Sequence, residues 1–384
     1  MKFRTRAIHI GSEPDPATGA VVPPIHVAST FIQPGAGEWG RFDYSRSGSP
    51  TRSNVERTIA NLENGAGALA FASGMAATHC AVMHLRSGDH ILAGSDVYGG
   101  TYRLLHKIAN RSGIEVSLSA IDDLANLESA IRPNTKMLWI ESIGNPLMTI
   151  PDIERIAHIT RKLGILLAVD NTFATPALVR PIELGADIVM HSATKYLGGH
   201  SDCLAGALVA SNEKLLSELY FVQNATGGVL SPFDSFLIAR GIKTLELRVR
   251  EQSRTAMAIA EWLAQHNCVT RVLYPGLESH PGHSIAAKQM DGAFGAMISF
   301  EIDGDFQATK QVCQSTELFG LAVSLGAVES LIEQPASMSH ASYDAADRAR
   351  FGIRDSLIRI SVGLEDVDDL IADLDQAIRN AVKK

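Results

Sequence analysis

The sequence lacks long apolar runs, a surplus of basic residues and closely spaced cysteines, and each absence excludes a class of protein. Among its 384 residues, no apolar run approaches the roughly 18 residues of a membrane-spanning helix, and the N-terminus carries no apolar segment typical of secretion signals. The formal net charge of −8, with arginines and lysines scattered singly, argues against nucleic acid and other polyanions as partners. We therefore expect a cytoplasmic protein that binds neither membranes nor nucleic acid.

The cysteines and histidines do not form a metal-binding pattern. None of the cysteines belongs to a Cys-x-x-Cys pair, and they stand far apart at Cys80, Cys203, Cys268 and Cys313. Such cysteines are typical of reduced, mostly buried thiols in a cytosolic protein. His280 and His283 form a close pair, but a zinc site needs three or four ligands and no second pair accompanies them. We expect no bound metal.

The remaining composition, with 46% hydrophobic and 20% charged residues, is that of an ordinary soluble globular protein. Its length predicts roughly two to three domains. Residues 1–50 are rich in proline, glycine and serine and lack periodicity, yet they carry aromatic residues that a disordered tail would lack. These aromatic residues are Phe31, Trp39, Phe42 and Tyr44. We expect an ordered arm that lies against the body or against a neighbouring subunit.

Between residues 51 and 245, short apolar strands alternate with helices, which predicts an α/β fold with a mostly parallel sheet covered by helices. The expected strands are 68–72, 90–94, 115–119, 136–140, 165–169, 187–190 and 205–210, and the expected helices include 51–63, 74–85, 101–110 and 153–163. Residues 246–384 are expected to form a smaller α+β domain. Its strands are expected at 296–302, 321–324 and 357–362, and its helices at 305–315 and 367–382.

Four polar groups follow predicted strands, at the edge where open parallel sheets bind their ligands. Residues 73–75 (Ser-Gly-Met) open a helix, whose N–H groups favour an anion such as phosphate. Asp170 and Asn145 follow two further strands. Lys195 follows the strand 187–190, where a lysine must be paired or have its pKa lowered by desolvation, which makes the amine nucleophilic. Taken singly, these residues are also compatible with a helix cap, a turn or a surface loop.

Together, these groups are what pyridoxal phosphate requires. Its aldehyde needs a lysine for a Schiff base, its pyridinium nitrogen needs a carboxylate, and its phosphate needs N–H and O–H donors. Lys195 and Asp170 supply the first two. Ser192 and Thr194, beside residues 73–75, are expected to bind the phosphate.

One competing pattern is present. Residues 35–40, with the sequence Gly-Ala-Gly-Glu-Trp-Gly, match the dinucleotide-binding pattern G-x-G-x-x-G. They follow Gln-Pro rather than a strand and lead into polar sequence rather than an apolar helix, so the strand–turn–helix context is missing. We therefore do not expect NAD as the cofactor.

The sequence Ser-Ala-Thr-Lys-Tyr at 192–196, followed by Gly-His-Ser-Asp at 199–202, resembles the cofactor-lysine signature of the pyridoxal-phosphate enzymes of cysteine and methionine metabolism. This family includes cystathionine γ-synthase, cystathionine γ-lyase and cystathionine β-lyase. The resemblance covers nearly the whole chain. The matching segments are residues 42–46, 50–52, 72–75, 97–100, 169–173, 324–326, 329–331 and 357–363. It implies an aspartate-aminotransferase-like fold of type I, with residues 51–245 binding the cofactor and residues 246–384 holding the substrate carboxylate.

The resemblance also implies roles on the cofactor side. Ser73, Gly74 and Met75 belong to the phosphate loop, and Tyr98 stacks on the cofactor ring. Tyr98 and Lys195 are the expected catalytic residues, with the lysine moving protons. Tyr44 and Arg46 of the arm 1–50 would donate to the cofactor phosphate of a neighbouring subunit, because an arginine fork suits phosphate. The active site would then be composite, in a homo-oligomer that we expect to be a tetramer built as a dimer of dimers.

On the substrate side, the resemblance implies that Arg359 holds the α-carboxylate of a small amino-acid substrate, aided by Ser330 and Asn145. Asp43 and Glu329 resemble acidic residues of the γ-synthase and γ-lyase branches. Two carboxylates would suit an amino group on the distal arm of cystathionine or on incoming cysteine. Alternatively, Asp43 and Glu329 are ordinary acidic residues exposed to solvent.

The branches of the family differ in reaction. A γ-synthase joins an O-acylhomoserine and cysteine into cystathionine for methionine biosynthesis, whereas a γ-lyase converts cystathionine to cysteine, 2-oxobutanoate and ammonia. Segments 227–230 and 240–245 resemble bacterial γ-synthases, which favours γ-replacement. Methionine γ-lyases also resemble this chain, but they carry a cysteine where Gly100 stands, which argues against that reaction. Cystathionine β-lyase, O-acetylhomoserine sulfhydrylase and a silent, cofactor-binding regulatory homologue are the further alternatives.

Overall fold

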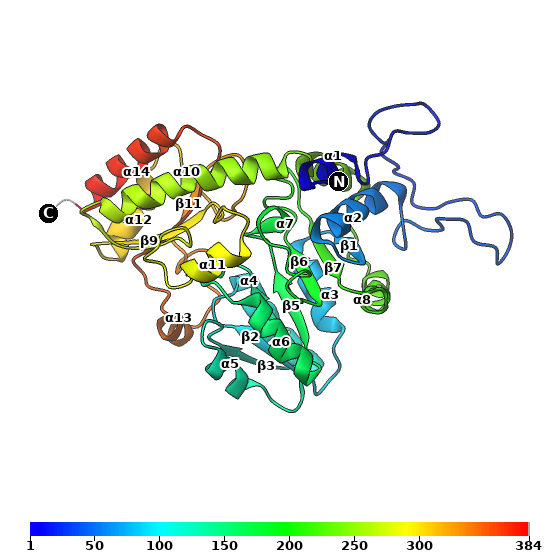
Figure 1. Cartoon of the computed structure of the whole chain (residues 1–384), viewed down its shortest axis with the longest axis horizontal. Helices are drawn as coiled ribbons and strands as arrows, with labels where there is room; N and C mark the ends of the chain where they lie inside the picture. The colour runs from blue at the N-terminus through cyan, green and yellow to red at the C-terminus, as the bar shows by residue number, and fades with distance from the viewer. Residues whose placement is uncertain (383–384) are drawn as a thin grey trace.

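The computed structural model describes residues 1–382, so the last two residues of the predicted segment 246–384 lie outside it (Figure 1). A seven-stranded sheet occupies the first part of the chain, in the order β1-β7-β6-β5-β4-β2-β3. Its strands are β1 Gly67–Phe71, β2 His90–Gly94, β3 Glu115–Ser119, β4 Thr135–Glu141, β5 Leu166–Asp170, β6 Ile188–His191 and β7 Gly206–Ala210. All seven strands correspond to expected ones: β2 and β3 have the expected bounds, and the bounds of the other five differ by at most one residue.

The strands β2 to β6 pair in parallel, and β7 runs antiparallel to both of its neighbours, β1 and β6. Because β7 alone is reversed, the carboxyl ends of the other six strands lie at one edge of the sheet. The predicted α/β fold with a mostly parallel sheet is confirmed. This shared edge brings together the loops that carry the predicted cofactor residues.

Helices cover both faces of this sheet, which is why its central strands are largely apolar on both sides. Alternate residues of β4 show the two faces: Leu138 and Ile140 belong to one hydrophobic cluster, and Met137 and Trp139 to the other. The helices of this part are α2 Pro50–Glu63, α3 Gly74–Met83, α4 Gly99–Lys107, α5 Leu124–Ala130, α6 Ile153–Leu163, α7 Thr175–Leu178, α8 Glu213–Thr226 and α9 Pro232–Ile242, with a 3₁₀ turn at Ala109–Ser112.

A second, five-stranded sheet follows in the order β10-β11-β12-β9-β8. Its strands are β8 Val269–Leu273, β9 Met297–Ile302, β10 Gly320–Leu321, β11 Leu331–Glu333 and β12 Leu357–Ser361, and its helices are α10 Leu245–Gln265, α11 His283–Gln289, α12 Phe306–Ser315, α13 Ala345–Phe351 and α14 Val367–Ala381. The long helix α10 begins at the predicted boundary near residue 245 and runs toward the second sheet (Figure 1). That each part is a domain of its own stays a prediction.

The second sheet departs from the sequence expectation in several elements. The expected strand 321–324 is wrong beyond Leu321, because the chain turns there and Ser324 has a φ of +149°. In this part the elements β8, β11, α11 and α13 were not expected, and earlier in the chain α1 (Phe3–His9), α5 and α7 were not expected either. Most are short, and β8 buries only Leu273 completely, so these segments carry little of the periodicity that marks an element.

Residues 1–50 contain a short helix, α1 Phe3–His9, and then a long excursion that leaves the body (Figure 1). Phe31 and Phe42 pack against each other across this excursion, with ring centroids 5.5 Å apart. Ile32 and Trp39 are largely exposed on it. An excursion with exposed apolar side chains has the form that an arm reaching another subunit would need.

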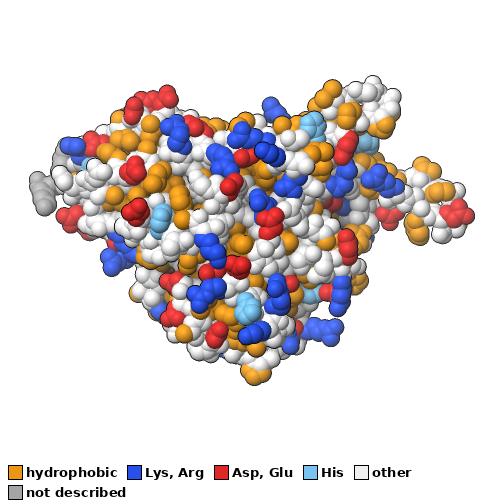
Figure 2. All heavy atoms as spheres, viewed as in Figure 1, with side chains coloured by type: hydrophobic (Ala, Val, Ile, Leu, Met, Phe, Trp, Pro, Cys, Tyr) orange, Lys and Arg blue, Asp and Glu red, His pale blue; other side chains and the backbone are white. Residues whose placement is uncertain are grey.

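The charged side chains are mixed over the face drawn in Figure 2, with acidic and basic groups interspersed. Among the helices of residues 1–382, none combines the length and the apolar composition needed to cross a membrane. Over the same residues, no group of three His, Cys, Asp or Glu side chains is arranged to hold a metal ion.

Candidate active site

A cavity of about 390 Å³ lies at the carboxyl edge of the seven-stranded sheet, where its loops meet loops of the second sheet. We call it the carboxyl-edge cavity. The predicted site residues that line it are Ser73, Gly74, Met75, Tyr98, Asn145, Asp170, Ser192, Thr194, Lys195 and Arg359. They come from the loops that follow β1, β2, β4, β5 and β6, together with Arg359 from β12.

Lys195 lies in the loop after β6, and its Nζ donates a hydrogen bond to Ser324 Oγ at 2.7 Å. Burial, together with the nearby Arg359 guanidinium, lowers the pKa of this amine to about 8, and Glu333 acts in the opposite direction. An amine with this pKa is partly neutral near physiological pH and can therefore act as a nucleophile or accept a proton.

Asp170 ends β5 and is buried at the cavity wall. Its Oδ1 accepts hydrogen bonds from the Thr172 backbone N–H at 3.0 Å and from Thr172 Oγ1 at 2.5 Å. Burial raises the pKa of Asp170, while the Thr172 donors and His191 act in the opposite direction. A carboxylate at this position suits the protonated ring nitrogen of pyridoxal phosphate, because a cation would repay the cost of its burial.

Behind Asp170, a buried polar cluster holds the ends of β5 and β6 in place. Glu63 Oε1, at the end of α2, accepts hydrogen bonds from His191 Nε2 at 2.7 Å and from Asn171 Nδ2 at 2.9 Å. All three side chains are almost completely buried. This cluster ties the helix α2 to the loops that carry Asp170 and Ser192.

The start of α3 fits a phosphate group. Ser73 caps the helix by accepting a hydrogen bond from the Ala76 N–H at 3.1 Å. A Cβ atom at Gly74 would lie 2.9 Å from Ser192 Cβ, so only glycine allows this approach. Thr194 Oγ1 bonds both the N–H and the C=O of Ala205. The helix N-terminus, the glycine cradle and the hydroxyls of Ser73 and Ser192 form a donor set of the kind that binds phosphate.

Tyr98 lies immediately before α4 with its ring partly exposed at the cavity, as an aromatic that stacks on a cofactor ring would be. Its backbone N–H donates to Glu141 Oε1 at 2.6 Å. Glu141 was not among the predicted residues, although it ends β4 as Asp170 ends β5, and the two lie opposite each other in the sheet. Burial, with Asp170 beside it, raises the pKa of Glu141 well above its usual range.

On the opposite wall, Arg359 is buried and makes three contacts. Its Nη1 lies 3.0 Å from Glu333 Oε1 and donates to Asn145 Oδ1 at 2.8 Å, and its Nη2 donates to the C=O of Ser324 at 3.2 Å. Glu333 was not predicted, and Ser324 was recognised only as part of a matching segment. Arg103 of α4 also lines the cavity and was missed, because an exposed arginine within a helix carries no distinguishing signal.

Ser330 requires a correction. Its side chain is buried away from the cavity, where Oγ donates to Glu365 Oε2 at 2.8 Å and accepts from the Gly363 N–H at 2.8 Å. The hydroxyl is used to hold a turn, so the geometry does not support contact with a substrate carboxylate.

The remaining predicted residues lie outside the carboxyl-edge cavity of their own chain. Glu329 is exposed, with Ser201 Oγ at 3.4 Å from its Oε2. Asp43, Tyr44 and Arg46 belong to the excursion, where Arg46 Nε donates to Asn224 Oδ1 at 3.3 Å. Their roles stay predictions that depend on a second subunit.

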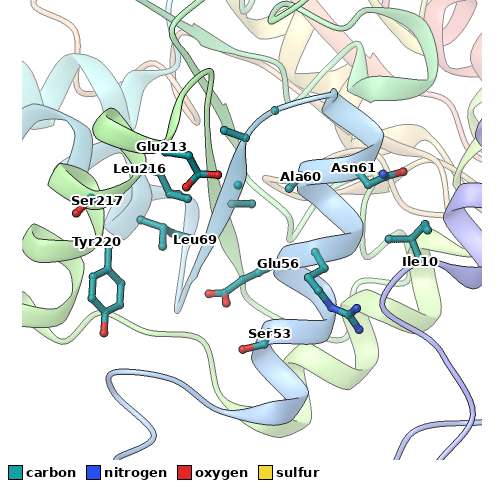
Figure 3. A pocket seen from close by; sticks show the side chains of 15 residues that line it. Ile10, Ser53, Glu56, Ala60, Asn61, Leu69, Glu213, Leu216, Ser217 and Tyr220 are labelled. Carbon is teal, nitrogen blue, oxygen red and sulfur yellow. The ribbon is translucent and has the colours of Figure 1, made fainter. Parts of the chain in front are cut away.

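A second hollow, of about 620 Å³, lies between α2, β1 and α8 (Figure 3). Its most buried acid, Glu56, accepts a hydrogen bond from the Ala70 N–H at 3.0 Å and lies 3.3 Å from Arg52 Nε. Burial raises the pKa of Glu56 to about 7. Because Glu56 is explained by these contacts and the predicted site residues lie elsewhere, we place the chemistry in the smaller carboxyl-edge cavity.

Known proteins resemble this chain over almost its full length. The model of the Cys/Met metabolism PLP-dependent enzyme family matches residues 4–379. A cystathionine gamma-synthase of Mycobacterium tuberculosis is 50% identical over 376 residues, which cover 97% of this chain and 96% of that protein. A cystathionine beta-lyase of Coxiella burnetii is 50% identical over 376 residues, which cover 97% of each chain.

Among solved structures, cystathionine gamma-lyase from Lactobacillus plantarum, complexed with L-serine, superposes with a TM-score of 0.97. It is 44% identical and covers 100% of both chains. Relatives with three different reaction names therefore have similar identities to this chain. The residues of the pocket, rather than overall similarity, must decide among the reactions.

Proposed function

The chain belongs to the Cys/Met metabolism PLP-dependent enzyme family, and from this premise we propose that it is a cystathionine γ-synthase, which exchanges the γ-substituent of an O-acylhomoserine for cysteine. The family is pyridoxal-phosphate-dependent, and the observation that carries the proposal is the presence of Lys195, Asp170 and Arg359 in one cavity. The choice of γ-replacement is supported by the similarity of segments 227–230 and 240–245 to bacterial γ-synthases.

When bound, pyridoxal phosphate supplies an electron sink for the charge that remains on a substrate carbon after its proton leaves. We infer that Ser73, Gly74, Ser192 and Thr194 hold the phosphate, while Asp170 holds the ring nitrogen in its protonated form. Tyr98 would cover the ring face. These assignments are supported by the donor set at the start of α3 and by the burial of Asp170.

Lys195 is the proton carrier in this proposal. Its lowered pKa, near 8, allows the amine to accept a proton from the substrate Cα and return it at a neighbouring carbon. The hydrogen bond to Ser324 orients the amine within the cavity. A γ-replacement needs a second proton removal at Cβ, which a flexible lysine side chain can reach from the same position.

Arg359 would bind the α-carboxylate of the substrate, with Asn145 holding the guanidinium in place through Oδ1. A planar arginine fork suits a carboxylate in a bidentate arrangement. Asp43 and Glu329 would bind the amino group at the distal end of the substrate, once the arm of a neighbouring subunit is in place.

The proposal requires a homo-oligomer, which we infer to be a dimer of dimers. Lys195→Ala and Arg46→Ala variants should each be nearly inactive, because each lacks one part of every site. Mixing and exchanging their subunits should restore about a quarter of the activity, since half of the dimers would be mixed and each would have one complete site. No recovery after exchange, with both variants shown to be in mixed oligomers, would contradict a composite site.

The reaction is tested by product analysis. The purified protein receives cystathionine alone, and then O-succinylhomoserine or O-acetylhomoserine with cysteine. Faster cystathionine formation supports γ-synthase. The second candidate is γ-lyase, the reaction named for the solved relative that covers 100% of this chain, and it predicts 2-oxobutanoate from cystathionine as the faster reaction. Pyruvate with homocysteine would indicate β-lyase, and a colourless protein after loading with cofactor would indicate a silent homologue.

A further inference from the structure

The arginine that faces the substrate already has a partner built into the sheet. Glu333 at the end of β11 lies directly opposite Arg359 of β12 in the antiparallel register, and both side chains line the carboxyl-edge cavity. Glu333 Oε1 lies 3.0 Å from Arg359 Nη1, and the two side chains are only 1% and 3% exposed. Glu333 also accepts a hydrogen bond from Ser339 Oγ. The positive charge of Arg359 is therefore neutralised within the protein.

The contacts of Arg359 leave one nitrogen of the guanidinium without a hydrogen-bond acceptor among the described residues. Nη1 is used by Glu333 and Asn145, and Nη2 is used by the Ser324 carbonyl. Within residues 1–382, Arg359 Nε has no hydrogen-bond acceptor although it is buried. Because Nε and a neighbouring Nη form a fork that matches a carboxylate, a substrate carboxylate on the Nε side of Arg359 would give Nε its missing acceptor without displacing Glu333.

We propose that Glu333 is a specificity-determining residue that acts through Arg359, as an internal counterion that weakens the binding of anions to this arginine. The inference rests on the proposed role of Arg359 in binding the α-carboxylate. Two carboxylates that share one guanidinium repel each other, so each lowers the affinity of the other. An anion that contacts only Arg359 is then bound weakly. An amino acid is bound more tightly, because it is also held through its amino group.

The chain offers a matched control. Glu301 on β9 is also buried in the five-stranded sheet and also contacts arginines, with Arg354 Nη1 at 2.9 Å and Arg271 Nη1 at 3.3 Å. It does not line the carboxyl-edge cavity. Replacing either glutamate with glutamine removes one buried negative charge from an arginine contact in the same sheet. Only Glu333→Gln removes it from beside the cavity.

The test compares two amines that differ only in the carboxylate. L-alanine and ethylamine are titrated into the cofactor-loaded wild type, Glu333→Gln and Glu301→Gln, and binding is followed by the visible absorbance of the cofactor. Neither ligand has a leaving group, so no turnover is needed. The ratio of the two affinities isolates the contribution of the carboxylate. Acetate, added as a competitor of L-alanine, reports the binding of a lone anion.

We expect Glu333→Gln to raise the L-alanine to ethylamine affinity ratio at least about fivefold and to tighten acetate by a similar factor, a size typical of coupling between two sites. Glu301→Gln should leave the ratio and the acetate affinity at the wild-type values. Glu333→Asp retains the charge but moves it one methylene away from Arg359, so it should raise the affinity ratio less than Glu333→Gln does. It also provides a second variant if the glutamine variant does not fold.

An unchanged or lower ratio in folded Glu333→Gln, or an equal rise in Glu301→Gln, would overturn the inference. In an Arg359→Leu background, Glu333→Gln should no longer change the L-alanine to ethylamine affinity ratio. If Arg359→Leu alone keeps the wild-type ratio, Arg359 does not bind the carboxylate, and the premise of the inference is lost as well. Because these titrations do not depend on cystathionine formation, the inference can fail while the proposed reaction holds, and the reaction can fail while the inference holds.

Discussion

The two walls of the carboxyl-edge cavity handle buried charge in different ways. On the wall formed by the seven-stranded sheet, Lys195, Asp170 and Glu141 stand at strand ends without ion pairs to one another, and burial displaces the pKa of each toward its neutral form. On the wall formed by the five-stranded sheet, Arg359 and Glu333 are equally buried but form an ion pair. The first wall is suited to exchanging protons, and the second to holding a fixed charge.

The largest effect is expected where the proton-exchanging wall loses its amine. Lys195→Ala should lower kcat by about four orders of magnitude or more, because no other amine lines the cavity among the described residues, and should abolish the absorbance of the covalently bound cofactor. Lys214→Ala, at a solvent-exposed lysine, serves as the control. Residual activity above a hundredth of the wild-type value would show that Lys195 is not the proton carrier.

The charge-holding wall should respond in affinity and stability instead. Arg359→Leu should lower kcat/KM about 100-fold or more through loss of carboxylate binding, with the cofactor still bound. It should also reduce the free energy of unfolding by about 3–5 kcal/mol, since Glu333 is left buried without its partner. Both are measured by steady-state kinetics and denaturant unfolding.

A double variant separates these two effects. Arg359→Leu combined with Glu333→Leu removes both charges, so most of the lost stability should return because no unpaired charge remains buried. Activity should not return. If the double variant is as unstable as the single one, the stability loss comes from packing rather than from the broken ion pair.

A smaller effect is expected at the residue that joins the two walls. Ser324 accepts from Lys195 through Oγ and from Arg359 through its carbonyl, so Ser324→Ala removes only the first contact. We expect kcat to fall about tenfold, the cost of one hydrogen bond to a charged group, with little change in KM. A rise in KM without a fall in kcat would indicate that the hydroxyl serves the substrate wall.

The smallest effect is a shift in pH dependence. The pKa of Lys195 is lowered from 10.5 to about 8, so the amine becomes neutral as the pH rises through 8. The rate at which the apoenzyme binds pyridoxal phosphate covalently should therefore increase with pH, with a midpoint near 8. Glu333→Gln should move the midpoint down by up to about one unit, because Glu333 raises the pKa of Lys195. A wild-type midpoint near 10.5 would contradict this account.

Much of the proton-exchanging wall was predictable because its residues end apolar strands. Lys195 and Asp170 were recognised by this signal, and the parallel strand order brings them to one edge. Glu141 has the same signal, because it follows the expected strand 136–140, but Asn145 was chosen as the candidate after that strand. The other wall was harder to predict, because β11 has three residues and Ser324 lies in an irregular turn.

Ser330 shows why a matching segment does not define a contact. The segment 329–331 resembles the family's substrate region, yet Glu365, which is 35 residues away in sequence, takes the hydroxyl of Ser330. The direction of a side chain depends on neighbours that are distant in sequence. Hydroxyls are especially affected, since they bond any nearby donor or acceptor.

The sequence by itself determined the alternation of strands and helices, the family and most of the cofactor wall, because strand periodicity and strand-end motifs are local properties. Only the tertiary structure decided that Glu333 stands opposite Arg359 and that Ser324 contacts both Arg359 and Lys195. The physical reason is that strand register and the pairing of buried charges depend on how segments distant in sequence pack together.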